Sequence, residues 1–563
     1  MKDLRLSSVP VAVGSTSFLV LLLTVILAQQ QVTSISALFF YIQDYFVACA
    51  MMALLLLAIV WRPALRLPDR LPTSPQIAGA AIVLAGLLWL GTYVVMLNYP
   101  LTRDEHMVVF DMAIYRAGRL AQPMDAAWAG YFKALVPTFL LDVPDNRLLV
   151  SAYLPMNAAA RALFSLVADP ALLNPVLTAL GLLLIYHLAR RLFPDSAGAV
   201  WTVLLGYILS TQILVNAMTS YAMAGHLFLN LLWLSLFLDG RRAAHAGAMV
   251  VGLVAVGYHQ VIFHPLFAAP FILGLALDRR WRAFLAYVAA YAAAGLFWIS
   301  YPQFVTSLSG ITAANGSVAG AGGFLQDRVI PLLLQRDPFT LQKTLFNLLR
   351  TLTWAPLFLG PLLVLALPSI RNRQGIAAPL ASGVAMTLVA MVILLPSQGH
   401  GWGYRYLHPV MGNLLLLAGY GYRQAAIAHR ASADRLVATL GGATAVLLIP
   451  FLLWSTHRFV EPYVRLTALI SRQPSDFVIV DTSPPSTAID QVRNAATLAN
   501  RPLVFSSRHL SIAQIAELCR RGAVSLVGRD AFAATGFVRR NPDEAGGQKM
   551  VPGLTADCLI GAR

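Results

Sequence analysis

"QIAGAAIVLAGLLWLGTYVVML", residues 76–97, contains no charged residue, and after three further residues it is followed by "LTRDEHMVVF", residues 101–110. A run of about 20 apolar residues is long enough to cross the ~30 Å hydrocarbon core of a bilayer as a helix. The second segment places the carboxylates of Asp104 and Glu105 and the imidazole of His106 directly beyond that helix. The two segments together predict a membrane-spanning helix with a charged segment at its surface end.

Apolar segments of this kind recur along the whole chain. Of its 563 residues, 58% are hydrophobic and 12% are charged, which excludes an ordinary water-soluble globular protein. The sequence therefore predicts an all-α polytopic membrane protein of about thirteen transmembrane helices, at residues 11–28, 37–60, 76–97, 172–189, 198–216, 221–238, 246–262, 264–278, 283–300, 346–367, 376–396, 406–422 and 437–457. The first segment lacks a small-residue cleavage site, so we expect it to remain as a helix.

Basic residues predict the orientation, because short cytoplasmic loops are enriched in Lys and Arg. Clusters of these residues fall at every second connection between the predicted spans. The N-terminus is therefore expected in the cytoplasm, and four segments are expected outside: 98–171, 301–345, 397–405 and the tail after 458. The net charge of +16 follows from this topology, and no compact basic domain with interleaved aromatic residues indicates a nucleic-acid partner.

The tail has a different pattern from the rest of the chain. Short apolar runs typical of buried strands alternate with helical spacing, in the order 476–483, 486–500, 501–507, 510–522 and 523–530. This alternation predicts a small α/β domain. The chain then divides into an N-terminal transmembrane hairpin with a cytoplasmic loop, a transmembrane domain that includes the first large periplasmic loop 98–171, and a periplasmic α/β domain, at 1–75, 76–457 and 458–563. Cys519 and Cys558 both fall in this last part, where a disulfide and two free thiols are equally open readings.

The adjacent acids Asp104 and Glu105 have two readings. They are loop charge at the water interface, or they belong to an active site at the membrane surface. The segment 98–171 is long for a connection, and loops of that length are usually functional or disordered. It contains "DMAIYRAGRL", residues 111–120, with helical spacing of apolar residues, and several aromatic residues, including Tyr153. We therefore expect it to be ordered and to lie along the membrane surface.

Transfer of a sugar from a lipid phosphate is a reaction that uses acids at this position. A carboxylate takes the proton of the attacking acceptor, and a neighbouring carboxylate orients the acceptor or holds a cation. The phosphate leaving group calls for a cation, preferably arginine. The best candidate is Arg405 in "GHGWGYRYLHP", residues 399–409, because an arginine on the outer side runs against the topological trend. The alternative is an aromatic belt in which Arg405 reaches out to water.

Four segments resemble the GT-C class of integral membrane glycosyltransferases, near the protein O-mannosyltransferase and aminoarabinose transferase group. They are "TRDEHMVVFDMAIYRAGRL" at 102–120, "NRLLVSAYLPMNAAARALF" at 146–164, "NPVLTALGLLLIYHLARRLF" at 174–193 and "GYRYLHPVMGNLLLLAGYG" at 403–421. They occur in the order and topology of that class and cover roughly residues 76–425. "AYLPMN" departs from the class in lacking a double proline and a glycine, and His264 stands where relatives often have arginine before proline.

The resemblance implies roles for particular residues. Asp104 would be the general base, and Glu105 would orient the acceptor or bind a divalent metal cation, with Asp104 as the second ligand. Arg405 and Tyr404 would hold the donor phosphate. The expected pocket residues are His106, Tyr153, His259, His264 and His400. No cofactor other than that cation is expected.

Several of these assignments have open alternatives. His106 is also readable as a hydrogen-bonded surface residue, and His259 and His264, beside a break in the helix pattern, as helix-packing residues. Lys343 and Arg336 are candidates for the lipid phosphate or for solvated charge. The Gly-rich segment 311–324 lacks the lysine of a phosphate-binding loop and reads as a flexible loop over the site.

The function expected from the sequence is a glycosyltransferase, moving a hexosyl or pentosyl group from a polyprenyl-phosphate-linked donor. The acceptor would be an envelope glycolipid, polysaccharide or protein at the periplasmic face of a bacterial inner membrane. A transporter or flippase of lipid-linked sugars is the main alternative, and it predicts discontinuous helices in two related halves. A third reading is a non-catalytic assembly protein whose tail recruits partners.

Overall fold

The computed structural model describes residues 8–30, 34–61, 63–136, 139–141, 143–309, 330–334, 338–483 and 486–537. Arg336, Cys558 and the Gly-rich segment 311–324 lie outside these ranges, so the predictions made for them stay predictions. Within the described ranges Cys49 is a free thiol and Cys519 is disulfide-bonded.

Long apolar helices make up most of the molecule, which is an integral membrane protein. By length and composition, seven described helical segments could cross a membrane, or eight if one bent pair counts as a span. The seven are α2 (Val9–Ala28), α3 to α4 (Ile35–Val60), α5 (Ser74–Val94), η3 with α10 (Pro170–Leu192), α16 (Trp281–Leu308), α21 (Ala377–Leu394) and η5 to α23 (Arg405–Ser471). The bent pair is α11 (Ala197–Ile208) with α12 (Thr211–Ala217), which meet at 46°.

The count of thirteen transmembrane helices remains a prediction. Four of the expected spans form shorter apolar helices, namely α13 (Met223–Asp239), α14 (Arg242–Val256), α15 (Phe263–Leu277) and α20 (Leu359–Arg371). The expected span 346–367 is divided, because α19 (Thr340–Thr353) ends before Pro356 and α20 begins beyond it. Within α22 (Met411–Ala443), His429 has non-helical dihedral angles and interrupts the helix.

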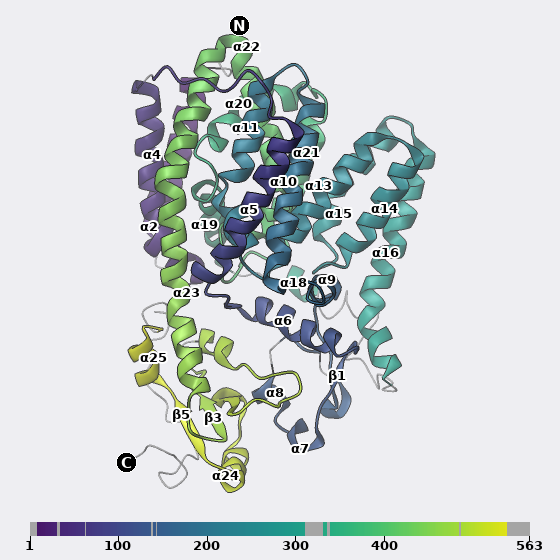
Figure 1. Cartoon of the computed structure of the whole chain (residues 1–563), viewed down its shortest axis with the longest axis vertical. Coiled ribbons are helices and arrows are strands. Elements are labelled where there is room, and N and C mark those ends of the chain that lie inside the picture. The colour runs from purple at the N-terminus through teal and green to yellow at the C-terminus, as the bar shows by residue number, and fades with distance from the viewer. Residues whose placement is uncertain are drawn as a thin grey trace.

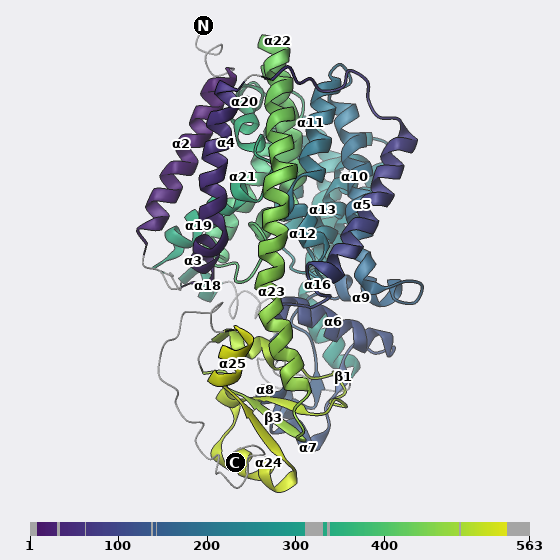
Figure 2. The ribbon, with the colours of Figure 1, turned by 60° about the vertical axis from the view of Figure 1, so that its left-hand side comes forward.

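The helices pack side by side into a bundle, and the remaining elements form a smaller lobe at one end of it (Figure 1). Helix α23 (Ile449–Ser471) leaves the bundle and enters this lobe, as both views show (Figure 2). The lobe combines the C-terminal sheet with much of the segment that follows α5. Residues about 300 positions apart in sequence therefore meet where bundle and lobe join.

The segment after α5 contains a helix that overlaps the predicted helical stretch 111–120 but begins earlier and ends at Arg116. Helix α6 (Arg103–Arg116) begins at the N-cap Thr102, whose side chain accepts a hydrogen bond from Glu105 N at 3.3 Å. Acidic residues in the first turn favour such a start, because they oppose the positive end of the helix dipole. Helix α6 lies across the end of the bundle (Figure 1). It is followed by the antiparallel strands β1 (Gln122–Pro123) and β2 (Leu148–Leu149) and the helices α7 (Ala126–Ala129), α8 (Phe132–Leu135) and α9 (Met156–Phe164).

The C-terminal sheet is parallel, with strand order β4-β3-β5. Its strands β3 (Phe477–Val480), β4 (Leu503–Ser506) and β5 (Val524–Val527) lie in the three predicted runs, together with α24 (Ile512–Arg521) and α25 (Arg529–Thr535). The predicted helix 486–500 is wrong beyond a short 3-10 helix, η7 (Ser486–Gln491). The Asn494 side chain donates to Leu135 O at 2.6 Å and to Val504 O at 2.8 Å, which ties this stretch to α8 and β4.

Candidate active site

The start of α6 sends its two carboxylates in different directions. Neighbouring residues on a helix of 3.6 residues per turn point about 100° apart. Asp104 faces the bundle loop that contains Arg405, whereas Glu105 faces the turn at Ser220. The two acids therefore have separate surroundings and separate partners.

Asp104 contacts two residues that the sequence analysis selected. Its Oδ2 lies 2.5 Å from Arg405 NH1, and its Oδ1 accepts a 2.5 Å hydrogen bond from the Tyr153 hydroxyl. The pair is nearly enclosed, with 14% of the Asp104 side chain and 9% of the Arg405 side chain exposed. Burial alone would raise the pKa of Asp104, but the charge of Arg405, aided by His259 and the Tyr153 hydrogen bond, outweighs burial and lowers it. The carboxylate is therefore ionised at neutral pH.

Arg405 is held by a network of loop contacts. Its backbone N–H donates to Gln398 Oε1 at 2.9 Å, and its guanidinium carbon lies 5.2 Å from the ring centres of both Tyr221 and Tyr406. Among the described residues, its Nε donates to no protein atom. The loop is fixed from beneath by Arg350, which donates to Gly401 O at 2.8 Å. The guanidinium is therefore held in place, while its Nε–H group has no partner among the described residues.

Arg350 is itself fixed by a buried ion pair. Its Nε lies 3.2 Å from Asp44 Oδ2, and both side chains are 1% exposed. The Asp44 carboxylate also accepts a 3.0 Å hydrogen bond from Trp354 Nε1. The N-terminal hairpin, which the sequence analysis set apart as a separate unit, therefore supports the Arg405 loop.

Gly403 gives this loop its turn. It has a φ of +67°, and a Cβ atom there would collide with the Gln212 carboxamide that pairs with the Tyr404 backbone. We expect Gly403→Ala to destabilise the protein by about 1–3 kcal/mol, because it combines a left-handed backbone with a clash, and to slow turnover by displacing Arg405. Thermal unfolding of the purified protein measures the first effect. The matched control is Gly442→Ala, where nothing lies within 4 Å of the added Cβ; equal melting temperatures for the two variants would contradict the prediction.

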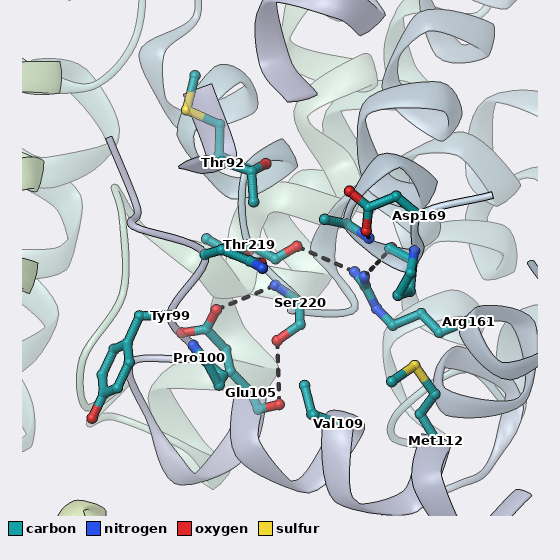
Figure 3. Close-up of a pocket in the computed structure, with 14 residues that line it drawn as sticks. Thr92, Tyr99, Pro100, Glu105, Val109, Met112, Arg161, Asp169, Thr219 and Ser220 are labelled. Atoms are coloured by element: carbon teal, nitrogen blue, oxygen red, sulfur yellow. Dashed lines mark hydrogen bonds between the residues drawn. The ribbon is translucent and has the colours of Figure 1, made fainter. Parts of the chain in front are cut away.

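Glu105 has no exposed surface. Its carboxylate accepts hydrogen bonds from Leu101 N at 3.1 Å and Ser220 N at 3.2 Å (Figure 3). Burial, partly offset by the backbone hydrogen bond from Ser220, raises its pKa to about 7. Glu105 therefore anchors the start of α6 to the turn at Ser220, and its predicted role beside the acceptor stays a proposal.

Two of the predicted histidines adjoin the centre. The ring of His259 lies 4.5 Å from that of Tyr153, and burial, with a contribution from Arg405, lowers its pKa to about 4. The Nε2 atom of His400 lies 3.1 Å from the Tyr463 hydroxyl, and its Nδ1 is 4.0 Å from Asp490. Tyr153 binds Asp104, and the backbone carbonyl of His400 accepts from the hydroxyl of Tyr221, whose ring lies beside Arg405, so both histidines belong to the wall of the site.

Of the other predicted residues, His264 and His106 have their contacts elsewhere, and Tyr404 packs against Tyr406, next to Arg405. His264 is held between Asn230 and Tyr291, at 2.7 and 2.6 Å, and so has the helix-packing role that the sequence left open. His106 lines a separate groove of about 220 Å³ between α6 and residues 494–497. Tyr404 pairs through its backbone with Gln212, and its ring packs against Tyr406 at 6.2 Å. Lys343 lies on α19, in the bundle.

The sequence analysis missed residues of the C-terminal domain that contact the site. Arg103, the residue before Asp104, places its Nε 2.8 Å from Asp490. Arg493 donates to Leu101 O at 3.2 Å and lies over the ring of Tyr99 at 4.1 Å. Nothing in the sequence marked Asp490, because its stretch was predicted as an ordinary helix. Tyr406 was also missed, although it stands beside Arg405 in the quoted motif.

The carboxylate pair does not fit a shared divalent cation in this arrangement. The oxygens of Asp104 already bind Tyr153 and Arg405, and those of Glu105 accept from two backbone N–H groups. In the part of the chain that the structure describes, no three His, Cys, Asp or Glu residues are grouped as metal ligands. A cation shared by the two acids needs converging oxygens, so we derive no step through a metal.

Tyr153→Phe removes one hydrogen bond to the ionised form of Asp104. Such a bond is worth about 1.5–3 kcal/mol, so the pKa of Asp104 should rise. If Asp104 acts as a general base, the acid limb of the pH profile of kcat/KM should then move to higher pH, because a base must be ionised to accept a proton. Tyr131→Phe is the control, since that hydroxyl donates to Gln514 O, at 3.4 Å, in the lobe. If the acid limb lies at the same pH in both variants, Tyr153 does not influence the pKa of Asp104 and the prediction is contradicted.

The fold and the site together define a polytopic α-helical membrane protein in which a carboxylate and an arginine meet at one end of the helix bundle. No protein-family model and no curated protein matches the sequence. The chain is similar to two solved structures of ArnT from Cupriavidus metallidurans. The structure bound to undecaprenyl phosphate has 13% identity and a TM-score of 0.49, over 83% of this chain and 89% of that one. The apo structure has 13% identity and a TM-score of 0.46, over 82% and 87%.

Proposed function

We propose that the protein is a glycosyltransferase that moves a sugar from a polyprenyl-phosphate-linked donor to an acceptor hydroxyl or amine, with Asp104 as the general base. The observation that carries this proposal is the 2.5 Å contact between Asp104 and Arg405, at the junction of the bundle and the lobe. It brings a proton acceptor and a phosphate-binding cation to one nearly enclosed point. That point adjoins the membrane-spanning helices, where the phosphate of a lipid donor lies.

The contact also suggests how the base becomes active. A donor phosphate would compete with Asp104 for the Arg405 guanidinium, whose Nε has no partner among the described residues. Once the donor phosphate binds Arg405, that arginine no longer favours the ionised form of Asp104. The pKa of Asp104 then rises, and Asp104 becomes a stronger base. Donor binding would thereby release Asp104 for the acceptor.

The proposed reaction needs no reagent other than the donor and the acceptor. The acceptor oxygen or nitrogen attacks the anomeric carbon and gives its proton to Asp104. The bond between that carbon and the phosphate oxygen breaks, and the electron pair leaves with the polyprenyl phosphate. Arg405 neutralises the charge that develops there. Attack opposite the leaving group inverts the anomeric configuration.

The remaining features of the proposal follow from the predicted topology. The site would face the periplasm of a bacterium, in the inner membrane, with the N-terminus in the cytoplasm. The acceptor would be an envelope glycolipid, polysaccharide or protein.

A donor panel tests the proposal. The purified protein is offered polyprenyl phosphates that carry different hexoses and pentoses, with an envelope extract as acceptor, in the presence and absence of chelator. Release of polyprenyl phosphate from one donor, unaffected by chelator, is the expected result. If none of the donors is consumed, the proposal is contradicted. If chelator abolishes activity, a divalent metal cation takes part in the reaction.

The transporter reading has one observation in its favour, the 46° bend between α11 and α12. Such transporters carry a broken helix in each of two related halves, whereas only this bent pair was found in the described ranges. Reconstituted vesicles distinguish the two functions. Movement of an intact lipid-linked sugar across the bilayer, without cleavage, would favour the transporter.

A further inference from the structure

A cavity of about 220 Å³, lined by apolar and polar residues that include Glu105, lies beside the start of α6. Figure 3 shows it between α6, which contributes Val109 and Met112, and the turn that contains Thr219 and Ser220. Arg161 enters from α9. Neither Asp104 nor Arg405 lines this cavity, so it is distinct from the candidate active site.

Arg161 is the main charged group here, and it is 3% exposed. It donates to Pro170 O at 2.7 Å and to Thr219 O at 3.2 Å, while its Nε has no partner among the described residues. No described carboxylate forms an ion pair with it. The carboxylates of Glu105 and Asp169 act on its charge only through longer-range electrostatic interaction. A buried guanidinium whose direct partners are neutral carbonyls is costly in a protein interior.

The two acids that line the cavity are committed to other partners. Asp169 accepts hydrogen bonds from Trp89 Nε1 at 2.7 Å, Tyr93 OH at 2.6 Å and Ala171 N at 2.9 Å. Glu105 is bonded to two backbone N–H groups, and burial keeps its pKa near 7. Arg161 therefore remains the group through which this cavity would attract a charged ligand.

The surroundings place the cavity at the level of a bilayer surface. Trp89 and Tyr93 are 40% and 41% exposed on α5, as expected of an interfacial aromatic belt. On and just after α9, Leu163, Leu166 and Val167 are 69%, 71% and 84% exposed. Large exposed apolar side chains next to such a belt are typical of a helix lying in the membrane interface.

We propose that this cavity binds the phosphate of a lipid headgroup, with Arg161 as the anion-binding residue. The phosphate would take the unused Nε donor and neutralise the charge of Arg161, with the hydroxyls of Thr219 and Ser220 close by. At 220 Å³ the cavity is smaller than a site for a whole drug-sized ligand, about 300–1,000 Å³. It therefore suits a headgroup whose chains remain in the bilayer. The site is separate from the proposed donor site and does not depend on the glycosyltransferase function.

A structural role for Arg161, tying α9 to the turn at Thr219, is the competing explanation, and two variants separate them. Arg161→Gln removes the charge. Met112→Trp fills the cavity from α6 and leaves both backbone bonds of Arg161 in place. Controls are Arg116→Gln, an exposed arginine on the same helix as Met112, and Arg405→Gln, which removes the candidate donor site.

The experiment measures the melting temperature of the full-length, delipidated protein in detergent. One arm adds didecanoyl phosphatidylglycerol and another adds didecanoyl glycerol, which has the same chains without phosphate. A third arm replaces sodium chloride by sodium phosphate at constant ionic strength. We expect phosphatidylglycerol to raise the melting temperature by several degrees in the wild type and both controls, with less than a third of that shift in Arg161→Gln and Met112→Trp.

Each outcome decides the proposal. A shift that survives in Met112→Trp, or one lost only in Arg405→Gln, would overturn it, as would equal shifts from the lipids with and without phosphate. Stabilisation by inorganic phosphate alone would keep an anion site but overturn the lipid as its source. If Arg161→Gln fails to fold, Met112→Trp decides by itself.

Discussion

Asp104→Asn should slow sugar transfer by about 10²–10⁴-fold, the usual contribution of a general base. The amide has the shape of the carboxylate, and its oxygen still accepts the hydrogen bond from Tyr153, but it cannot take the acceptor's proton. The protein should remain folded and bind the donor, because Arg405 then has no acid competing for it. Single-turnover rates with the purified variant measure the effect on chemistry, and donor titration measures the effect on binding.

The matched control for this substitution is Asp145→Asn. That aspartate lies in the same segment, its side chain is 71% exposed, and its φ of 58° is one that asparagine adopts readily. We expect its turnover to equal that of the wild type. If Asp104→Asn folds normally and its turnover is unchanged, Asp104 is not the general base.

The sequence predicted the centre of the site because Asp104 and Arg405 each depart from an expected pattern. One is charge placed directly after an apolar run, and the other is an arginine that the topology does not need. Their contact, across 301 positions, could not be predicted from either pattern. It depends on how α6 crosses the end of the bundle, which is decided by packing between distant segments.

Residues whose role depends on side-chain direction were predicted less well. Glu105 stands next to Asp104 in sequence, yet the helix turns it about 100° away, toward Ser220. His259 and His264 looked equivalent around a helix break, but only His259 reaches Tyr153, whereas His264 is held by Asn230. The contribution of Asp490 was not predictable, because a single sequence does not reveal that the tail folds back onto α6.

Arg405→Lys should raise the KM for the donor by at least about tenfold with a smaller change in kcat. Lysine keeps the charge but loses the planar fork that binds phosphate oxygens in pairs. Arg405→Gln should also raise the donor KM, and it has a second effect, because it removes the cation that lowers the pKa of Asp104. Without that cation burial dominates and the pKa rises, so the acid limb of kcat/KM should move to higher pH in Arg405→Gln and stay near its original place in Arg405→Lys.

Initial rates at varied donor concentration and pH measure both effects. Arg423→Lys serves as the control, since that arginine forms an exposed pair with Asp195, at 2.5 Å, where the fork has little consequence. An unchanged donor KM in both Arg405 variants would mean that the phosphate binds elsewhere. A shift of the acid limb in Arg405→Lys as large as in Arg405→Gln would mean that geometry, and not the charge beside Asp104, determines its pKa.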